Sequence, residues 1–214
     1  MRLALFGPPG AGKGTQADLL VQRFDLDHIS TGNIIRDAIK RRTPIGLEAL
    51  ELVNKGRLVP DAIAKRLAES AIDKSDGDNW VLDGYPRTLE QATWLTEYLE
   101  RRKTPMLAVV SLVVPDSTIV GRLSKRRLNR ETGESYHLDF NPPPPDVPKE
   151  SVIQRPDDMP EAILKRIEVY KKETMPLIEY YARQGILEEI VGVGSMQEVH
   201  DRIIETLQNR RDQV

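Results

Sequence analysis

The chain has 214 residues, of which 39% are apolar and 30% are charged, with 31 basic and 33 acidic side chains and a formal net charge of −2. This length fits one domain core with small insertions, and the near balance of charge argues against a nucleic-acid binder or a polybasic membrane binder. The absence of cysteine excludes disulfides, thiolate zinc sites and cysteine nucleophiles. The sequence shows no signal peptide and no 18-residue apolar stretch, so we expect a soluble cytoplasmic protein that spans no membrane.

Short apolar segments alternate with helical patterns along the chain. Strands are expected at residues 3–6, directly before Thr31, and at 80–82, 106–114 and 187–191. Helices are expected at residues 13–24, after Asp116 as a cap, at 160–182 with a kink at Pro176, and after the capping box Ser195–Met–Gln–Glu198. The alternation predicts an α/β fold, in which a parallel five-stranded sheet lies between two layers of helices.

Two segments interrupt this alternation. Residues 31–60 are expected to form two short helices without a strand, and residues 128–155 are polar and include five prolines between Pro142 and Pro148. We interpret both as insertions into one core made of residues 1–30, 61–127 and 156–214.

A glycine-rich segment follows the first expected strand and opens the first expected helix. It reads Gly-Pro-Pro-Gly-Ala-Gly-Lys-Gly-Thr over residues 7–15. Glycines let backbone N–H groups surround phosphate oxygens, while the helix N-terminus and Lys13 supply positive charge. The spacing predicts a phosphate-binding loop (P-loop), although Gly14 stands at the usual Ser/Thr position and the hydroxyl follows at Thr15. The alternative is a glycine-rich turn with a surface lysine.

Two further motifs accompany this loop. His28-Ile-Ser-Thr-Gly32 is followed by Arg36, and Asp83-Gly-Tyr-Pro-Arg-Thr88 is followed by Gln91. Together the three motifs resemble those of the nucleoside monophosphate kinases. From Met1 to about Leu207 the chain is similar to adenylate kinases of the long-lid type.

This resemblance implies two nucleotide sites. The residues implied for ATP binding are Gly10, Ala11, Gly12, Lys13, Gly14, Thr15, Arg122, Arg126, Ser135 and Tyr136. Those implied for AMP binding are Thr31, Gly32, Arg36, Arg57, Leu58, Val59, Gly84, Tyr85, Pro86, Arg87, Gln91, Arg155 and Arg166. Gln91 is expected to read adenine, because a side-chain amide donates and accepts at once.

The resemblance also implies the charged groups of the reaction. Those implied in catalysis are Lys13, Arg87, Arg122, Arg126, Arg155, Arg166 and Asp158. Asp83 would orient Mg²⁺ through bound water. Arg122 and Arg126, four residues apart, are expected on one helix face.

Simpler readings remain open for several of these residues. Thr31 could cap a helix, Asp83 could begin a turn, and Asp157 and Asp158 could cap the helix that contains Glu161. Arg122 and Arg126 could form a solvated basic face. The three histidines, His28, His137 and His200, are better interpreted as structural residues than as metal ligands.

The segment 128–155 departs from relatives that hold this lid with cysteines. Asn129 and Thr132 stand where the first Cys-x2-Cys pair would be, and the downstream half is proline-rich. No zinc is therefore expected, and we expect polar contacts of Asn129 and Thr132 in its place.

The function implied is reversible, Mg²⁺-dependent phosphoryl transfer, ATP + AMP ⇌ 2 ADP, by a monomer with no nucleic-acid or membrane partner. The nearest alternatives are a kinase for another nucleoside monophosphate or one that uses GTP as donor. A nucleotide switch is disfavoured because Asn54-Lys-Gly-Arg57 lacks the aspartate of a guanine motif. A non-catalytic nucleotide-binding module would be expected to lose Lys13 or some arginines, and all are present.

Overall fold

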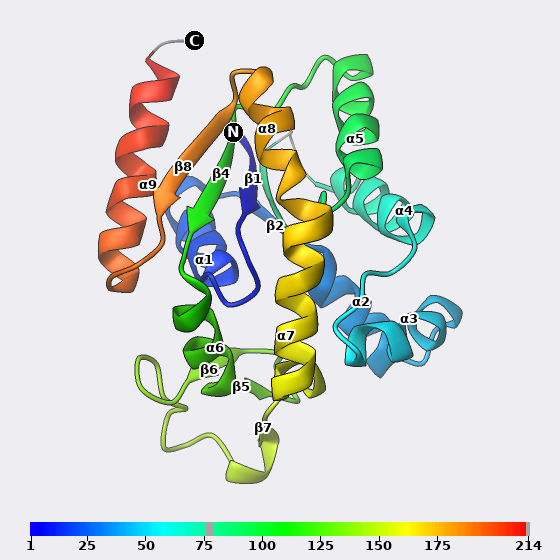
Figure 1. Cartoon of the computed structure of the whole chain (residues 1–214), viewed down its shortest axis with the longest axis vertical. Coiled ribbons are helices and arrows are strands. Elements are labelled where there is room, and N and C mark those ends of the chain that lie inside the picture. Colours follow the sequence, from blue (N-terminus) through cyan, green and yellow to red (C-terminus); the bar gives the residue numbers. More distant parts are fainter. Residues whose placement is uncertain (76–78, 213–214) are drawn as a thin grey trace.

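The computed structural model describes residues 1–75 and 79–212 (Figure 1). Residues 76–78, 213 and 214, which belong to the segments assigned to the core, lie outside the described residues. The central sheet contains the strands β1 (Arg2–Phe6), β2 (Asp27–Ser30), β3 (Trp80–Asp83), β4 (Ala108–Val113) and β8 (Leu187–Val191). They are all parallel, in the order β2-β3-β1-β4-β8. The predicted α/β fold with a five-stranded parallel sheet is confirmed.

Helices cover both faces of this sheet. They are α1 (Lys13–Phe24), α4 (Asp61–Ile72), α5 (Leu89–Arg101), α6 (Asp116–Ser124), α7 (Pro160–Val169), α8 (Pro176–Arg183) and α9 (Met196–Arg211). Successive residues of a strand point to opposite faces, so Leu3 and Leu5 pack toward α1 and α9, whereas Ala4 and Phe6 pack toward α4, α5 and α8. The two buried clusters make the expected three layers.

Most expected boundaries agree with the structure. The first helix covers the predicted residues 13–24, and Ser195 and Glu198 form the capping box of α9. Instead of one helix over residues 160–182 with a kink at Pro176, the structure has α7, a π-helical stretch (Tyr170–Thr174) and α8, which begins at Pro176. Pro176 has no N–H to donate, so the regular helical hydrogen bonding is interrupted before it. The predicted cap at Asp116 is wrong: Asp116 is the first residue of α6, and its carboxylate pairs with Lys171.

The segment 31–60 forms two helices, α2 (Thr31–Lys40) and α3 (Pro44–Asn54), as predicted. Thr43 caps α3 by accepting a hydrogen bond from the Gly46 backbone at 3.1 Å. Gly46 also lies against the backbone of α2, where a Cβ atom would be 2.1 Å from the Ala38 carbonyl oxygen. The two helices therefore pack in direct backbone contact.

A second, antiparallel sheet occupies the other interruption. Its strands are β5 (Arg126–Asn129), β6 (Ser135–His137) and β7 (Val152–Ile153), in the order β6-β5-β7. Asn129 Oδ1 accepts hydrogen bonds from the backbones of Glu131 (2.9 Å) and Thr132 (3.4 Å), and Thr132 Oγ1 accepts from Glu134 (3.2 Å). These side-chain contacts of Asn129 and Thr132 organise the β5–β6 turn.

The two interruptions project from one end of the molecule, below the central sheet in the view of Figure 1. Among the residues that the structure describes, no helix has the length and apolar character needed to cross a lipid bilayer.

Candidate active site

The loop between β1 and α1 has the conformation that the glycine motif predicts. Gly10 and Gly12 have φ angles of 79° and 98°, which side-chain-bearing residues rarely adopt. The Lys13 ammonium turns back over the loop and donates to the carbonyl oxygens of Gly7 (2.7 Å) and Pro8 (2.9 Å). The alternative of a surface lysine beside a turn is thereby wrong.

Lys13 lies in a strongly cationic environment. Burial lowers its pKa to about 7; Asp83 opposes this shift, and the nearby charges of Arg87, Arg166 and Arg126 add to it. A bound anion would raise this pKa and favour the ammonium form, so the loop is electrostatically suited to phosphate.

Asp83 ends β3 beside this loop, at the carboxyl edge where open α/β sheets bind ligands. Burial alone would raise its pKa, but the adjacent His28 side chain and the positive charge of Lys13 outweigh burial, and the pKa is lowered. His28 places Nδ1 3.2 Å from Asp18 and Nε2 3.7 Å from Asp83. His28 therefore contacts the predicted metal-orienting residue, a relationship that the sequence pattern alone did not reveal.

The predicted placement of Arg122 and Arg126 on one helix face is wrong. Helix α6 ends at Ser124, and Arg126 begins strand β5. Arg122 donates to the carbonyl oxygens of Ala11 (3.3 Å) and Gly192 (3.1 Å), which places its guanidinium against the phosphate loop. The two arginines thus come from different elements, because the chain leaves the helix between them.

Asp158 lies at the centre of a buried charge cluster. It accepts two hydrogen bonds from Arg126, from Nε at 2.7 Å and Nη2 at 2.5 Å, and one from Arg166 Nη1 at 2.9 Å. Asp157 pairs with the same Arg166 nitrogen at 3.0 Å. The capping alternative for these aspartates is wrong, because both belong to the 3-10 turn Pro156–Asp158 and Met159 occupies the cap position of α7 without a side-chain bond.

Arg155 is buried in this cluster, close to other positive charges. Burial, together with the positive charges of Arg126 and Arg36, lowers its pKa to about 9, although Asp157 and Asp158 oppose that shift. Its buried Nε has no hydrogen-bond partner in the described structure. An incoming phosphate group would supply both the acceptor and the negative charge that Arg155 lacks.

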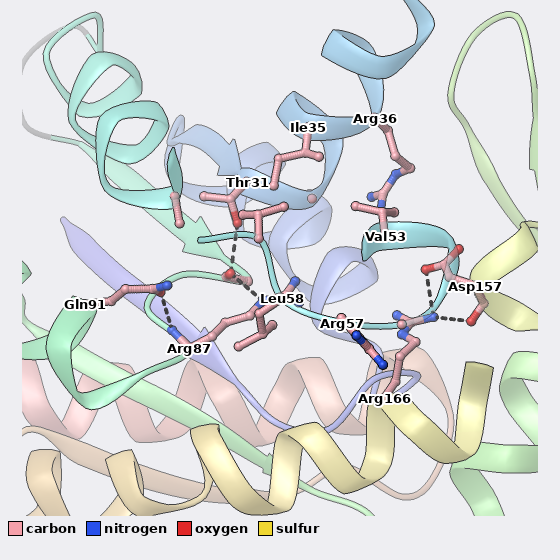
Figure 2. Close-up of a pocket in the computed structure, with 15 residues that line it drawn as sticks. Thr31, Ile35, Arg36, Val53, Arg57, Leu58, Arg87, Gln91, Asp157 and Arg166 are labelled. Carbon is pink, nitrogen blue, oxygen red and sulfur yellow. Dashed lines mark hydrogen bonds and ion pairs between the residues drawn. The ribbon is translucent and has the colours of Figure 1, made fainter. Parts of the chain in front are cut away.

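A cavity opens between α2, α3 and the edge of the sheet, with about 630 Å³ of empty space that includes its open mouth (Figure 2). Predicted AMP-site residues that line it are Thr31, Gly32, Arg36, Arg57, Leu58, Val59, Gly84, Arg87, Gln91 and Arg166. Ile35, Val53, Gly56, Ala64 and Asp157 line it as well and were not predicted. Tyr85, Pro86 and Arg155 do not line it.

The sequence could have indicated some of the cavity-lining residues that were not predicted. Ile35 and Val53 are apolar positions of the two short helices, and a helical-wheel analysis of residues 31–60 could have placed them on the inner face. Asp157 was singled out in the sequence, with Asp158, as a possible helix cap; the structure places it on the cavity wall, where it pairs with Arg166.

Thr31 and Arg87 converge on one backbone carbonyl at the floor of this cavity. Thr31 Oγ1 donates to the Gly84 oxygen at 2.9 Å and Arg87 Nε donates to it at 2.7 Å (Figure 2). Thr31 is not the cap of α2, because Ser30 occupies that position and accepts from the Asn33 backbone at 3.4 Å. The alternative of Thr31 as a helix cap is wrong.

A second cavity, of about 540 Å³, adjoins the first on the side of the phosphate loop. The residues common to both linings are Gly56, Leu58, Gly84, Arg87 and Arg166, and the second cavity adds Gly7, Lys13 and Pro86. Lys13 and Gln91 therefore line two adjoining cavities. The arrangement can hold two anionic ligands with their phosphates toward each other.

The lid residues Ser135 and Tyr136 line neither cavity. Ser135 is exposed on β6, and the buried Tyr136 donates its hydroxyl hydrogen to Glu134 at 2.8 Å. The other two histidines have structural partners: His137 Nδ1 accepts from the Asp139 backbone at 3.1 Å, and His200 Nδ1 lies 3.2 Å from Gln16 Oε1.

Comparisons with known proteins agree with this geometry. A family model described as adenylate kinase matches residues 5–186. A protein of Salinibacter ruber named adenylate kinase is 51% identical over 207 residues, which cover 97% of this chain and 98% of that protein. One from Clostridium botulinum is 43% identical (95% and 96% covered), and one from Caldanaerobacter subterraneus is 42% identical over the full length of both chains. The chain belongs to the adenylate kinase family and is a phosphotransferase enzyme.

Proposed function

We propose that this enzyme catalyses ATP + AMP ⇌ 2 ADP, with ATP on the phosphate loop and AMP in the cavity between α2 and α3. The observation that carries the proposal is that the two cavities adjoin each other and share lining residues, which include the cations Arg87 and Arg166. In-line phosphoryl transfer needs the two nucleotides end to end with positive charge between them.

At the ATP end, the phosphates would lie against the backbone N–H groups of Gly10, Ala11, Gly12, Gly14 and Thr15. Lys13 would release its two backbone carbonyls and pair with phosphate oxygens. Arg122, already beside Ala11, is suitably placed to contact the same nucleotide. Ser135 and Tyr136 would join this site only through movement of the β5–β7 sheet.

At the AMP end, the phosphate would contact Arg36, Arg87, Arg155 and Arg166. Thr31 and the backbone near Gly84 would shape the middle of the site. Gly32, Tyr85 and Pro86 are the sequence neighbours of these residues and would belong to the same part of the site. Arg57, Leu58 and Val59 would cover the nucleoside, and Gln91 would read the adenine edge. The unpartnered Nε of Arg155 supports an anion at this position.

The reaction requires no general base, because the attacking AMP oxygen is already ionised. What the protein must do is align the nucleotides, exclude water and spread the charge of the transferring group. The cations that would balance the negative charge of the transferring group are Lys13, Arg87, Arg122, Arg126, Arg155 and Arg166. Asp158 holds Arg126 and Arg166 in position through hydrogen bonds.

Mg²⁺ is the cofactor that the family implies, and the residues at the end of β3 suit it. Asp83 is an ionised carboxylate beside the loop, and Gly14 leaves the space next to it free of a side chain, since a Cβ there would lie 3.7 Å from Asp83 Oδ2. Mg²⁺ prefers oxygen ligands and keeps several waters, so Asp83, through water, and the ATP phosphates would hold it. When bound, it would neutralise phosphate charge.

We further propose that residues 31–60 and 128–155 are mobile covers on the core formed by residues 1–30, 61–127 and 156–214. Lys40 at the end of α2 donates to the carbonyl oxygens of Arg130 (3.3 Å) and Glu131 (3.2 Å) in the β5–β6 turn. This contact joins the two covers, and it supports a closed arrangement that excludes water.

We place the enzyme in the cytoplasm as a monomer, with no zinc and no nucleic-acid or membrane partner. GTP as donor, or another monophosphate as acceptor, is the nearest alternative. The test is ADP formation from Mg-ATP and AMP by the purified chain and by Asp83→Asn. We expect activity in the native chain and, in Asp83→Asn, a higher magnesium concentration for half-maximal rate. No transfer to AMP by the native chain would contradict the proposal.

A further inference from the structure

Gln91 is held by hydrogen bonds at both ends of its amide. It is 3% exposed at the start of α5, its Oε1 accepts from the Arg87 backbone N–H at 2.8 Å, and its Nε2 donates to Asp61 Oδ1 at 2.6 Å. A backbone N–H can only donate and an ionised carboxylate can only accept. The oxygen and nitrogen of the amide therefore cannot exchange places without losing both bonds.

Asp61 is itself fixed by a second partner. Its Oδ2 accepts a hydrogen bond from the Thr88 hydroxyl at 3.1 Å, and the same hydroxyl accepts from the Gln91 backbone at 3.3 Å. Asp61 is the first residue of α4, whereas Thr88 and Gln91 belong to the start of α5. The carboxylate thus connects the two helices and faces Gln91 with an acceptor.

The orientation of the amide decides which purine it matches. After the bonds to Arg87 and Asp61, the Gln91 amide retains one acceptor site on Oε1 and one N–H on Nε2. Adenine offers an amino donor at C6 beside an acceptor at N1, which pairs with this arrangement. A 6-oxopurine offers an acceptor at C6 beside an N–H at N1, and it would require the amide to turn over.

We propose that Asp61 is a positioning residue that fixes the amide of Gln91 in one orientation. The proposed AMP site thereby selects 6-aminopurine over 6-oxopurine nucleoside monophosphates. The inference rests on the proposed AMP site, in which Gln91 lines the cavity. Asp61 does not line that cavity and acts only through Gln91. Because a mismatched buried donor or acceptor is costly, a fixed amide discriminates more strongly than one that turns.

The test compares AMP with inosine monophosphate (IMP), in which an oxo group replaces the amino group at C6 and N1 carries a hydrogen, with no other change on the base. Steady-state kcat and KM with Mg-ATP are measured for the native enzyme, Asp61→Ser and Asp61→Asn. Serine is well tolerated at a helix start, and water in the space it leaves can donate as well as accept, so the amide is free to turn. In Asp61→Asn the side-chain oxygen still accepts from Gln91, and the Thr88 hydroxyl can rotate to accept from the new amide.

We expect Asp61→Ser to lower the ratio of kcat/KM for AMP to that for IMP by about tenfold or more, through a higher KM for AMP and a lower KM for IMP. Asp61→Asn should keep the native ratio within about twofold, because it retains an acceptor for Gln91. An equal fall for both nucleotides in Asp61→Ser would show a merely structural role and overturn the proposal, as would a ratio in Asp61→Asn that falls as far.

Two controls separate the possible failures. Circular dichroism checks folding, and Asp61→Thr replaces Asp61→Ser as the test variant if the serine variant does not fold. A native enzyme that does not phosphorylate AMP would contradict the proposed function. A native enzyme that is active on AMP, with a ratio unchanged by Asp61→Ser, would contradict only the inference on Asp61.

Discussion

Arg126 and Asp158 form a doubly hydrogen-bonded ion pair, with Nε to Oδ2 at 2.7 Å and Nη2 to Oδ1 at 2.5 Å. The arginine lies on the first strand of the β5–β7 sheet, and the fully buried aspartate lies in the turn that precedes α7. The pair therefore ties the first strand of the β5–β7 sheet, at the boundary of one proposed cover, to the turn before α7, and it does so inside the charge cluster that would receive phosphate.

Asp158→Asn should destabilise the nucleotide-free enzyme by about 3 kcal/mol, because Arg126 and Arg166 would lose their shared buried counter-ion. ADP, added without magnesium, should reduce this loss, since its phosphates supply negative charge near the same arginines. Thermal unfolding with and without ADP measures both effects. Asp139→Asn is the control: it breaks an exposed 2.7 Å pair with Lys125 and should cost about 0.5 kcal/mol or less. Equal losses in the two variants would contradict this account.

The packing of α2 on α3 predicts a strong effect of a single methyl group. Gly46→Ala would place a Cβ atom 2.1 Å from the Ala38 carbonyl oxygen, so the two helices must separate. We expect about 2 kcal/mol of destabilisation and a raised KM for AMP with little change in KM for ATP. In the matched control Gly121→Ala, no atom lies within 4 Å of the added Cβ, and helix propensity should stabilise α6 slightly. Similar kinetics in the two variants would contradict the assignment of this segment to AMP.

The contacts of His28 predict a stability difference that depends on pH. Burial lowers the pKa of His28, but the nearby carboxylates of Asp18 and Asp83 outweigh it and raise the pKa to about 9. A pKa above the unfolded value of 6.5 gives stability that is complete below pH 6.5 and lost as pH rises through 9. His28→Gln should therefore cost about 1 kcal/mol near pH 6 and much less near pH 9.5, as measured by urea unfolding.

His200 provides the opposite case. Burial, followed by the charge of Arg23, lowers its pKa, so its contribution to stability is present above pH 6.5 and lost as pH falls. The loss caused by His200→Gln should therefore grow with rising pH. If both variants showed a pH-independent loss, the pKa shifts would not describe these sites.

Local patterns carried most of the fold prediction. The alternation of buried strands with amphipathic helices, the glycine loop before Lys13 and the capping box at Ser195 each depend on neighbouring residues, and each was confirmed. The placement of Arg126 failed because helix α6 ends where the chain turns into a sheet that is completed by residues far along the chain.

The site was predictable where its residues lie in motifs and less so elsewhere. Thr31, Arg87 and Gln91 belong to recognisable motifs and line the cavity as expected. Asp61 contacts Gln91, which is 30 residues away in sequence. His28 contacts Asp83, which is 55 residues away. No local spacing indicates such contacts. Long-range polar contacts of this kind require the fold before they can be inferred.

The most direct test of the proposed function is ADP formation from Mg-ATP with AMP, GMP, UMP or CMP as acceptor, by the native enzyme and by Lys13→Met. We expect rapid transfer to AMP, weak transfer to the other three, and a loss of about a thousandfold in kcat in the variant, since the phosphate loop would lack its ammonium group. Preference for UMP or CMP would contradict the role of Gln91, and full activity of Lys13→Met would contradict the assignment of the phosphate loop.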